Sequence, residues 1–191
     1  IIFASSVHVE QDNPYGASKL AAVQALLKHS EKTCTPVYIF RLPRVFGKWC
    51  KPNYNSVVAT FCHNIARDLP IQIDDSPYPL SLVYIDDLVT TFARIMEGEQ
   101  PSKAYYGVQP SYTISVGELA DQIRTFRASR DTLISERVGD GLIRALYATY
   151  VSYLPPKDFV YEVPKHADSR GVFVEMLKTK DSGQFSFFTA H

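Results

Sequence analysis

The chain has 191 residues, 46% of them hydrophobic, and its 20 basic and 20 acidic side chains leave no net charge. Because nucleic acids and anionic membranes attract proteins with a basic excess, we expect neither as a partner. No apolar run approaches the roughly 20 residues of a membrane helix. The three cysteines lack metal-ligand spacing and fit a reducing compartment, so the composition predicts a cytoplasmic protein.

Strands and helices alternate over the first 153 residues. The apolar run 1–6 predicts a buried strand, and the apolar spacing after Pro14 predicts a helix over 14–32. The other expected elements are strands at 37–42 (ended by Pro43), near residue 72, at 80–85 and at 104–108, and helices at 57–68, 88–97, 116–127 and 141–153. This alternation indicates an α/β fold with a parallel sheet.

Two helix starts carry polar capping residues. Asp86 and Asp87 stand before the helix expected at 88–97, where a carboxylate stabilises the N-terminus. Ser115 and Glu118 have the spacing of a capping box. We therefore assign Asp86 and Asp87 to capping and not to chemistry.

The alternation of strands and helices ends after residue 153. Residues 154–167 open with a pair of prolines and are predicted to be a linker. Residues 168–191 contain a strand, a turn and a second strand of β-branched and aromatic residues. An isolated hairpin is marginal in water and exposes unpaired edges, so we expect the start of a truncated β-domain.

Tyr15 and Lys19 are the strongest candidates for catalysis. They lie four residues apart at the start of the expected helix and so share one face. An ammonium beside a phenol favours the ionised phenol, which can exchange a proton with a carbonyl or alcohol oxygen near neutral pH. The same spacing also occurs in helices where the Tyr packs and the Lys is solvated. A serine from the end of the preceding strand could bind the same oxygen, and strand alternation lets only one of Ser5 and Ser6 point there.

The run 14–19, read with the Ser-Ser strand end before it, resembles the extended short-chain dehydrogenase/reductase family, the NAD-dependent epimerases, dehydratases and reductases of nucleotide sugars. The resemblance implies that Tyr15 is the acid/base. Lys19 would be its electrostatic partner and a ligand of the cofactor ribose. Ser6 would be the hydroxyl on the substrate carbonyl, with Ser5 the weaker candidate. The hydride would come from a nicotinamide cofactor.

The Gly-rich turn that binds a cofactor pyrophosphate is absent, and the chain begins with Ile. We therefore expect a fragment. It would comprise the C-terminal part of a Rossmann-type doubly wound domain with its substrate-binding subdomain (1–153), the linker (154–167) and the first strands of a cupin-like domain (168–191).

Two further segments resemble the family. In the family, the residues that follow the strand corresponding to 37–42 line the nicotinamide. This resemblance makes Leu42, Pro43 and Val45 candidates for contact with the cofactor. The run 82–88 resembles a late stretch of the substrate domain, but Leu80 and Ser81 replace the Arg that holds a diphosphate in many relatives.

The loop 47–56 combines lysines, asparagines and aromatic residues between a strand and a helix. Aromatic rings can cover a base or sugar, amides can bind hydroxyls, and ammonium groups can meet a diphosphate. Lys51, Asn53 and Asn55 are therefore expected to bind substrate together with Ser6. A merely solvated loop is the alternative.

The runs 46–57, 11–16 and 168–171 bring the resemblance close to the bifunctional reductases of capsular polysaccharide synthesis, in which a short-chain-type reductase carries a C-terminal cupin domain. This implies NADPH-dependent reduction of the C4 ketone of a UDP-4-keto-6-deoxy-amino-hexose in UDP-N-acetyl-L-fucosamine synthesis. It also implies a UDP-sugar partner and a homodimeric full-length enzyme. NADH stays possible, because the strand end that selects the cofactor is absent.

The histidines have no ligand spacing, so no metal is assigned. A metal ion is expected only in a cupin part beyond His191. Two other functions stay open, a nucleotide-sugar 4-epimerase and a non-catalytic nucleotide-sugar-binding relative. Dehydration is disfavoured because Val7 and His8, and not an acidic pair, follow Ser6.

Overall fold

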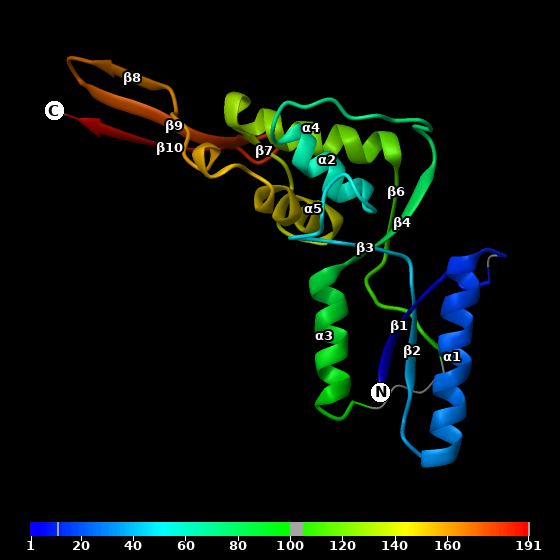
Figure 1. Cartoon of the computed structure of the whole chain (residues 1–191). Coiled ribbons are helices and arrows are strands. Elements are labelled where there is room, and N and C mark those ends of the chain that lie inside the picture. Colours follow the sequence, from blue (N-terminus) through cyan, green and yellow to red (C-terminus); the bar gives the residue numbers. More distant parts are fainter. Residues whose placement is uncertain (11, 100–104, 191) are drawn as a thin grey trace. The chain divides into compact units, whose positions relative to one another are not determined.

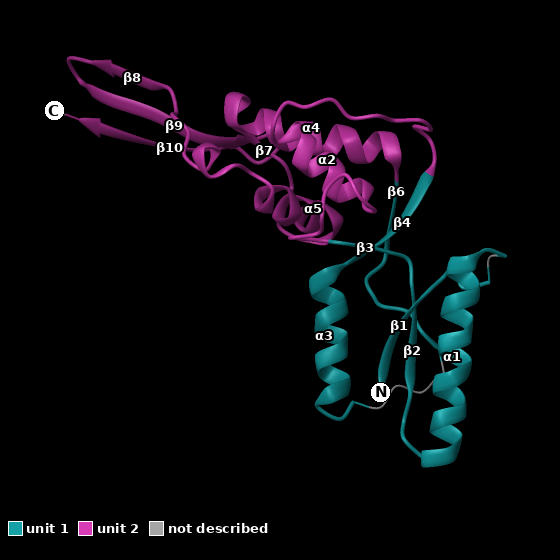
Figure 2. Ribbon diagram, viewed as in Figure 1, with its two compact units in different colours: residues 1–46, 79–114 teal, residues 47–78, 115–191 magenta. Residues whose placement is uncertain are grey.

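The computed structural model describes residues 1–10, 12–99 and 105–190 (Figure 1). Gln11, Ala104 and His191, which belong to expected motifs or elements, lie outside the described residues. The chain forms two compact units, coloured in Figure 2: unit 1 comprises residues 1–46 and 79–114, and unit 2 comprises residues 47–78 and 115–191. No helix in the described part is long and apolar enough to cross a membrane.

Unit 1 contains the expected parallel sheet. Its strands are β1 (Ile2–Ser6), β2 (Tyr38–Leu42) and β5 (Tyr105–Tyr106), in the order β1-β2-β5. Helices α1 (Pro14–Thr33) and α3 (Ile85–Met96) flank this sheet (Figure 1). The α/β prediction and the helix start at Pro14 are confirmed.

The core of unit 1 lies between the sheet and α3. Its buried members are apolar residues of β2, β4 (Pro79–Tyr84), α3 and the segment after β5: Phe40, Leu42, Val83, Leu88 and Val108. The strand expected to be buried over 1–6 is buried only at Ser5 and Ser6, because β1 is an edge strand of the described sheet and β2 is central.

A second sheet of unit 1 has the order β3-β4-β6, with β3 (Arg44–Phe46), β4 (Pro79–Tyr84) and β6 (Tyr112–Ser115). The strand expected near residue 72 is absent from this described segment. The capping role expected of Asp86 and Asp87 is also wrong. Helix α3 begins at Ile85 with Tyr84 as its N-cap, so both carboxylates lie in the first turn. There their negative charges still stabilise the positive end of the helix dipole.

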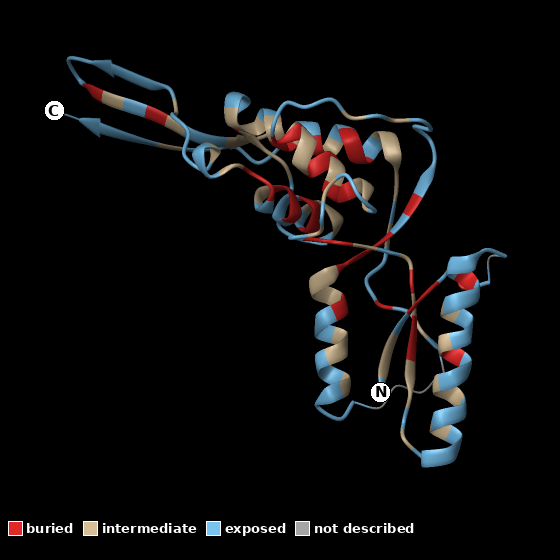
Figure 3. Ribbon diagram, viewed as in Figure 1, coloured by how far each residue is buried: buried red, intermediate tan, exposed pale blue. Residues whose placement is uncertain are grey.

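Unit 2 is built on three packed helices, α2 (Val57–Ile65), α4 (Val116–Thr132) and α5 (Gly141–Ser152). Figure 3 shows buried positions on all three. The capping box at the start of α4 is confirmed: Glu118 N donates to Ser115 Oγ at 3.2 Å, and Ser115 N donates to Glu118 Oε2 at 2.9 Å. Helix α4 extends five residues beyond the expected end.

The tail forms its own sheet, with β7 (Ile134–Ser135), β8 (Lys165–Asp168), β9 (Gly171–Thr179) and β10 (Gln184–Ala190). The short helix η1 (Pro156–Asp158) lies in the expected linker. The expectation of a hairpin without partners is wrong: β9 pairs with β10 along one edge and with β8 and β7 along the other. Strand β7 has only two residues, too few to leave a recognisable pattern in the sequence.

Candidate functional site

Ser5 and Ser6 close strand β1 and are both buried. Ser6 pairs in register with Leu42 of β2, and the Val7 N–H donates to the Leu42 carbonyl at 3.0 Å. Ser6 Oγ accepts a hydrogen bond from His8 N at 3.1 Å. Ser5 Oγ is buried and has no hydrogen-bond partner among the described residues, whereas the Ser6 hydroxyl can still donate to a ligand.

Tyr15 and Lys19 lie in the first two turns of α1. Asn13 caps this helix by accepting a hydrogen bond from Gly16 N at 2.8 Å, and Pro14 suits the first helical position because it needs no N–H partner there. Lys19 Nζ lies 5.8 Å from the centre of the Tyr15 ring and 5.5 Å from that of Phe3. The Tyr15 side chain is 53% exposed, so it is accessible to a ligand.

Lys19 also joins its helix to the serine-bearing strand. Its ammonium donates to the Ala4 carbonyl at 3.3 Å, next to the strand-end serines. An ammonium has three donors, and this bond uses one of them. The structure thus places Ser6, Tyr15 and Lys19 in unit 1, on two elements that one lysine connects.

The predicted cofactor-side residues follow directly along β2 and β3. Leu42 is buried in the core of unit 1 and Val45 packs against that core, so both help to hold the strand end in place. Pro43 is half-buried between the two strands and lacks an N–H to extend β2.

Lys51, Asn53 and Asn55 lie in unit 2, in the segment between β3 and α2. All three are exposed. The Lys51 ammonium lies 5.3 Å from the centre of the Tyr54 ring, and the Lys48 ammonium lies 5.5 Å from that of Trp49. Ammonium groups and aromatic faces are therefore presented side by side.

Asn53 is bound to helix α2. Its N–H donates to Thr60 Oγ1 at 3.0 Å, and its Nδ2 lies 3.5 Å from Asn64 Oδ1. Its φ of 53° lies in the left-handed region, which Asn tolerates better than most residues. Sequence reasoning missed Thr60, because a threonine inside a helix gives no signal that it binds a loop seven residues earlier.

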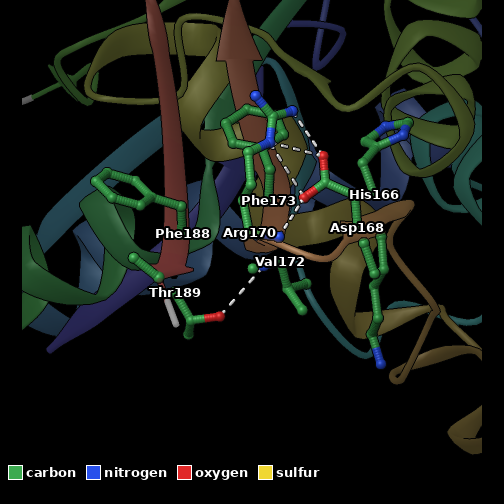
Figure 4. Close-up of a pocket in the computed structure, with 11 residues that line it drawn as sticks. His166, Asp168, Arg170, Val172, Phe173, Phe188 and Thr189 are labelled. Atoms are coloured by element: carbon green, nitrogen blue, oxygen red, sulfur yellow. Dashed lines mark hydrogen bonds and ion pairs between the residues drawn. The ribbon is translucent and has the colours of Figure 1, made fainter.

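No group of three or more potential metal ligands occurs among residues 1–10, 12–99 and 105–190. A pocket of about 680 Å³ lies on the tail strands and contains none of the predicted site residues (Figure 4). In it, hydrogen bonds from the Arg170 guanidinium lower the pKa of the Asp168 carboxyl. The two side chains form an ion pair at 2.6 Å that closes the β8–β9 turn.

Residues 3–106 match the model of the NAD dependent epimerase/dehydratase family. The whole chain is 59% identical to the UDP-2-acetamido-2,6-beta-L-arabino-hexul-4-ose reductase of Pseudomonas aeruginosa and covers 51% of that protein. The chain therefore spans about half the length of this relative.

Among solved structures, capsular polysaccharide assembling protein CapF from Staphylococcus aureus matches with a TM-score of 0.92 and 43% identity, over 97% of this chain and 52% of CapF. UDP-glucose 4-epimerase from Thermus thermophilus, solved with NAD, matches with a TM-score of 0.63 and 16% identity. The match covers 83% of this chain and 64% of the epimerase, and at this identity it shows the fold alone.

Proposed function

Because this chain belongs to the NAD dependent epimerase/dehydratase family, we propose that it carries the catalytic and substrate-binding residues of a nucleotide-sugar reductase. The reaction is the NADPH-dependent reduction of the C4 ketone of a UDP-4-keto-6-deoxy-amino-hexose, in UDP-N-acetyl-L-fucosamine and capsular polysaccharide synthesis. The 59% identity to a hexul-4-ose reductase over the whole chain supports this choice of substrate.

The observation that carries the proposal is the link between Lys19, Tyr15 and the end of β1. Lys19 lies near the Tyr15 ring and donates to Ala4, so the phenol and the strand-end hydroxyls belong to one small region of unit 1. In the proposed reaction, Tyr15 donates its proton to the C4 oxygen of the ketone. Ser6 donates a hydrogen bond to the same oxygen, and the positive charge of Lys19 stabilises the phenolate that remains.

A nicotinamide cofactor fits the residues present. Lys19 has two donors beyond its bond to Ala4, and they lie near the carboxyl end of a parallel strand, where open α/β sheets bind ligands. Lys19 and Tyr15 would hold the ribose, and Leu42, Pro43 and Val45 would lie beside the ring. When bound, the cofactor supplies the hydride.

The nucleotide sugar is the proposed partner of Lys51, Asn53 and Asn55. The ammonium of Lys51 suits the diphosphate, and exposed amides suit sugar hydroxyls. The Lys48–Trp49 and Lys51–Tyr54 pairs support this role, because they place cations beside rings that can cover a uracil or a sugar.

The proposal extends to the domain organisation, location and assembly of the protein. Residues 1–153 are assigned to the reductase, 154–167 to a linker and 168–191 to the beginning of a cupin-like domain. The protein is proposed to be a cytoplasmic homodimer that acts without nucleic acid or membrane.

The test is to incubate the protein, purified from its natural host, with NADPH and the UDP-4-keto-6-deoxy-amino-hexose. The proposal expects one NADPH oxidised for each sugar reduced at C4. With a UDP-hexose in place of the ketosugar, conversion to the C4 epimer without net NADPH oxidation would show a 4-epimerase instead. Binding of the sugar without any conversion would indicate a non-catalytic relative.

A further inference from the structure

The loop 47–56 holds two non-glycine residues in the left-handed region, Trp49 at φ 67° and Asn53 at φ 53°. The left-handed backbone is unfavourable for an L-residue, because the Cβ atom then comes too close to the following carbonyl oxygen. Such conformations persist where the surrounding structure over-determines them. The loop therefore needs support from outside itself.

Two hydrogen bonds from helices of unit 2 supply that support. The Tyr153 hydroxyl, at the end of α5, donates to the Cys50 carbonyl at 2.5 Å. Thr60 Oγ1 of α2 accepts from Asn53 N at 3.0 Å. The first bond fixes the peptide group between Cys50 and Lys51 and the second fixes the peptide group before Asn53. Lys51 thus lies between two anchored peptide planes.

Tyr153 is itself firmly held. Its side chain is buried, and its carbonyl accepts from the Arg67 guanidinium at 2.8 Å. Burial raises the pKa of the Tyr153 phenol to about 12, so the hydroxyl stays protonated and available as a donor at neutral pH. The bond to Cys50 spans 103 residues of sequence, which shows that α5 and the loop meet only in the folded chain.

We propose that Tyr153 is a positioning residue for the substrate loop: its hydroxyl holds the Cys50–Lys51 peptide, and so keeps the loop in its binding conformation before the nucleotide sugar arrives. This inference rests on the proposed substrate role of the loop. A loop that is ordered in advance binds more tightly, because ordering it does not subtract from the binding free energy.

The chain offers a matched control for the test. Tyr150 lies on the same helix, is 1% exposed, and has a hydroxyl without a hydrogen-bond partner among the described residues. Tyr153 is the residue that caps this helix, so Tyr153→Phe and Tyr150→Phe remove the same atom from two buried rings near the C-terminus of α5, and only the first removes the bond to the loop. Trp49 is the single tryptophan of the chain, so its fluorescence reports on the loop alone.

The experiment measures Trp49 fluorescence anisotropy and the affinity for UDP, by calorimetry, in the wild-type chain and both variants. Tyr153→Phe should lower the anisotropy and weaken UDP binding by about three- to tenfold, as expected for one lost hydrogen bond. In the Tyr153→Phe variant of the protein produced in its natural host, the KM for the nucleotide sugar should rise by a similar factor, with kcat unchanged. Tyr150→Phe should change none of these values.

A second variant keeps the test decisive if Tyr153→Phe folds poorly. Arg67 is exposed, and Arg67→Met frees the Tyr153 carbonyl but leaves the phenol. Arg67→Met should lower the anisotropy and the UDP affinity as well, by less than Tyr153→Phe.

Unchanged anisotropy in Tyr153→Phe, or equal losses in Tyr153→Phe and Tyr150→Phe, would overturn the inference. If wild type itself fails to bind UDP, the substrate role of the loop is wrong, and the anisotropy comparison still decides the role of Tyr153.

Discussion

The two groups of proposed functional residues are held in place in different ways. Ser6, Tyr15 and Lys19 lie on a strand end and on the first turns of a helix, where regular geometry positions each side chain. The 47–56 loop has no regular structure over most of its length and depends on hydrogen bonds from Thr60 and Tyr153. Local spacing therefore suffices to position the proposed catalytic groups, whereas the proposed substrate loop requires contacts distant in sequence. The predictions below test each half of this contrast.

The largest effect is expected from Tyr15→Phe. It removes the proposed proton donor and leaves the ring, so turnover should fall about a hundredfold or more, while cofactor affinity, which Lys19 also supports, should change far less. The measurement is steady-state reduction together with NADPH titration. Tyr38→Phe is the control, because the Tyr38 ring packs beside the core of the same unit. Near wild-type turnover in Tyr15→Phe would remove the basis of the catalytic assignment.

Lys19→Met should act on both turnover and cofactor binding. The variant keeps an apolar stem but loses the charge beside Tyr15 and the donor to Ala4. A hydrogen bond to a charged group contributes roughly 1.5–3 kcal/mol, so each quantity should fall about tenfold or more. Lys28→Met, on an exposed part of the same helix, is the control. A loss of turnover with unchanged cofactor affinity would contradict the proposed contact with the ribose.

The two asparagines of the loop should behave differently. Asn55→Ala should raise KM by an amount equivalent to roughly 1–3 kcal/mol, the cost of an unpaired polar partner. Asn53→Ala should raise KM and also lower the melting temperature, because Ala tolerates the left-handed backbone less well. Asn53→Gly separates these effects: it should restore stability without restoring KM. If neither Asn53→Ala nor Asn55→Ala alters KM or kcat, the loop does not bind the sugar.

The smallest effect concerns the pH dependence of α4. Hydrogen bonds from the Ser115 backbone, and then from its side chain, lower the pKa of Glu118 from its ordinary value of 4.5. The folded state therefore binds this proton less readily than the unfolded state. Its contribution to stability is present above pH 4.5 and is lost as the pH falls through the folded value. Melting temperatures of wild type and Glu118→Gln should differ less at acidic pH than at neutral pH, and a constant difference would contradict this.

Much of unit 1 could be predicted from the sequence. Apolar runs and Pro14 place β1, β2 and α1, and a four-residue spacing suffices to pair Tyr15 with Lys19 on one face. The helix start at Ile85 was missed because Asp86 and Asp87 are good residues both at a cap and in a first turn.

The rest depends on contacts between distant segments. The tail was expected to be an unpaired hairpin, but β9 is completed by β7, which is two residues long and pairs at Lys178 and Thr179. The bond from Tyr153 to Cys50 joins a helix end to a loop 103 residues earlier. Neither segment has a periodic pattern, so a single sequence carries no local signal for either contact.

The most direct test of the account follows a labelled hydride. NADPH that carries deuterium on the transferred position is incubated with the UDP-4-keto-6-deoxy-amino-hexose and the protein, and the product is examined by NMR and mass spectrometry. We expect one deuterium at C4 for each NADPH oxidised, with the rate of incorporation reduced about a hundredfold or more in Tyr15→Phe. Product without deuterium at C4, or incorporation that is as fast in Tyr15→Phe as in wild type, would contradict it.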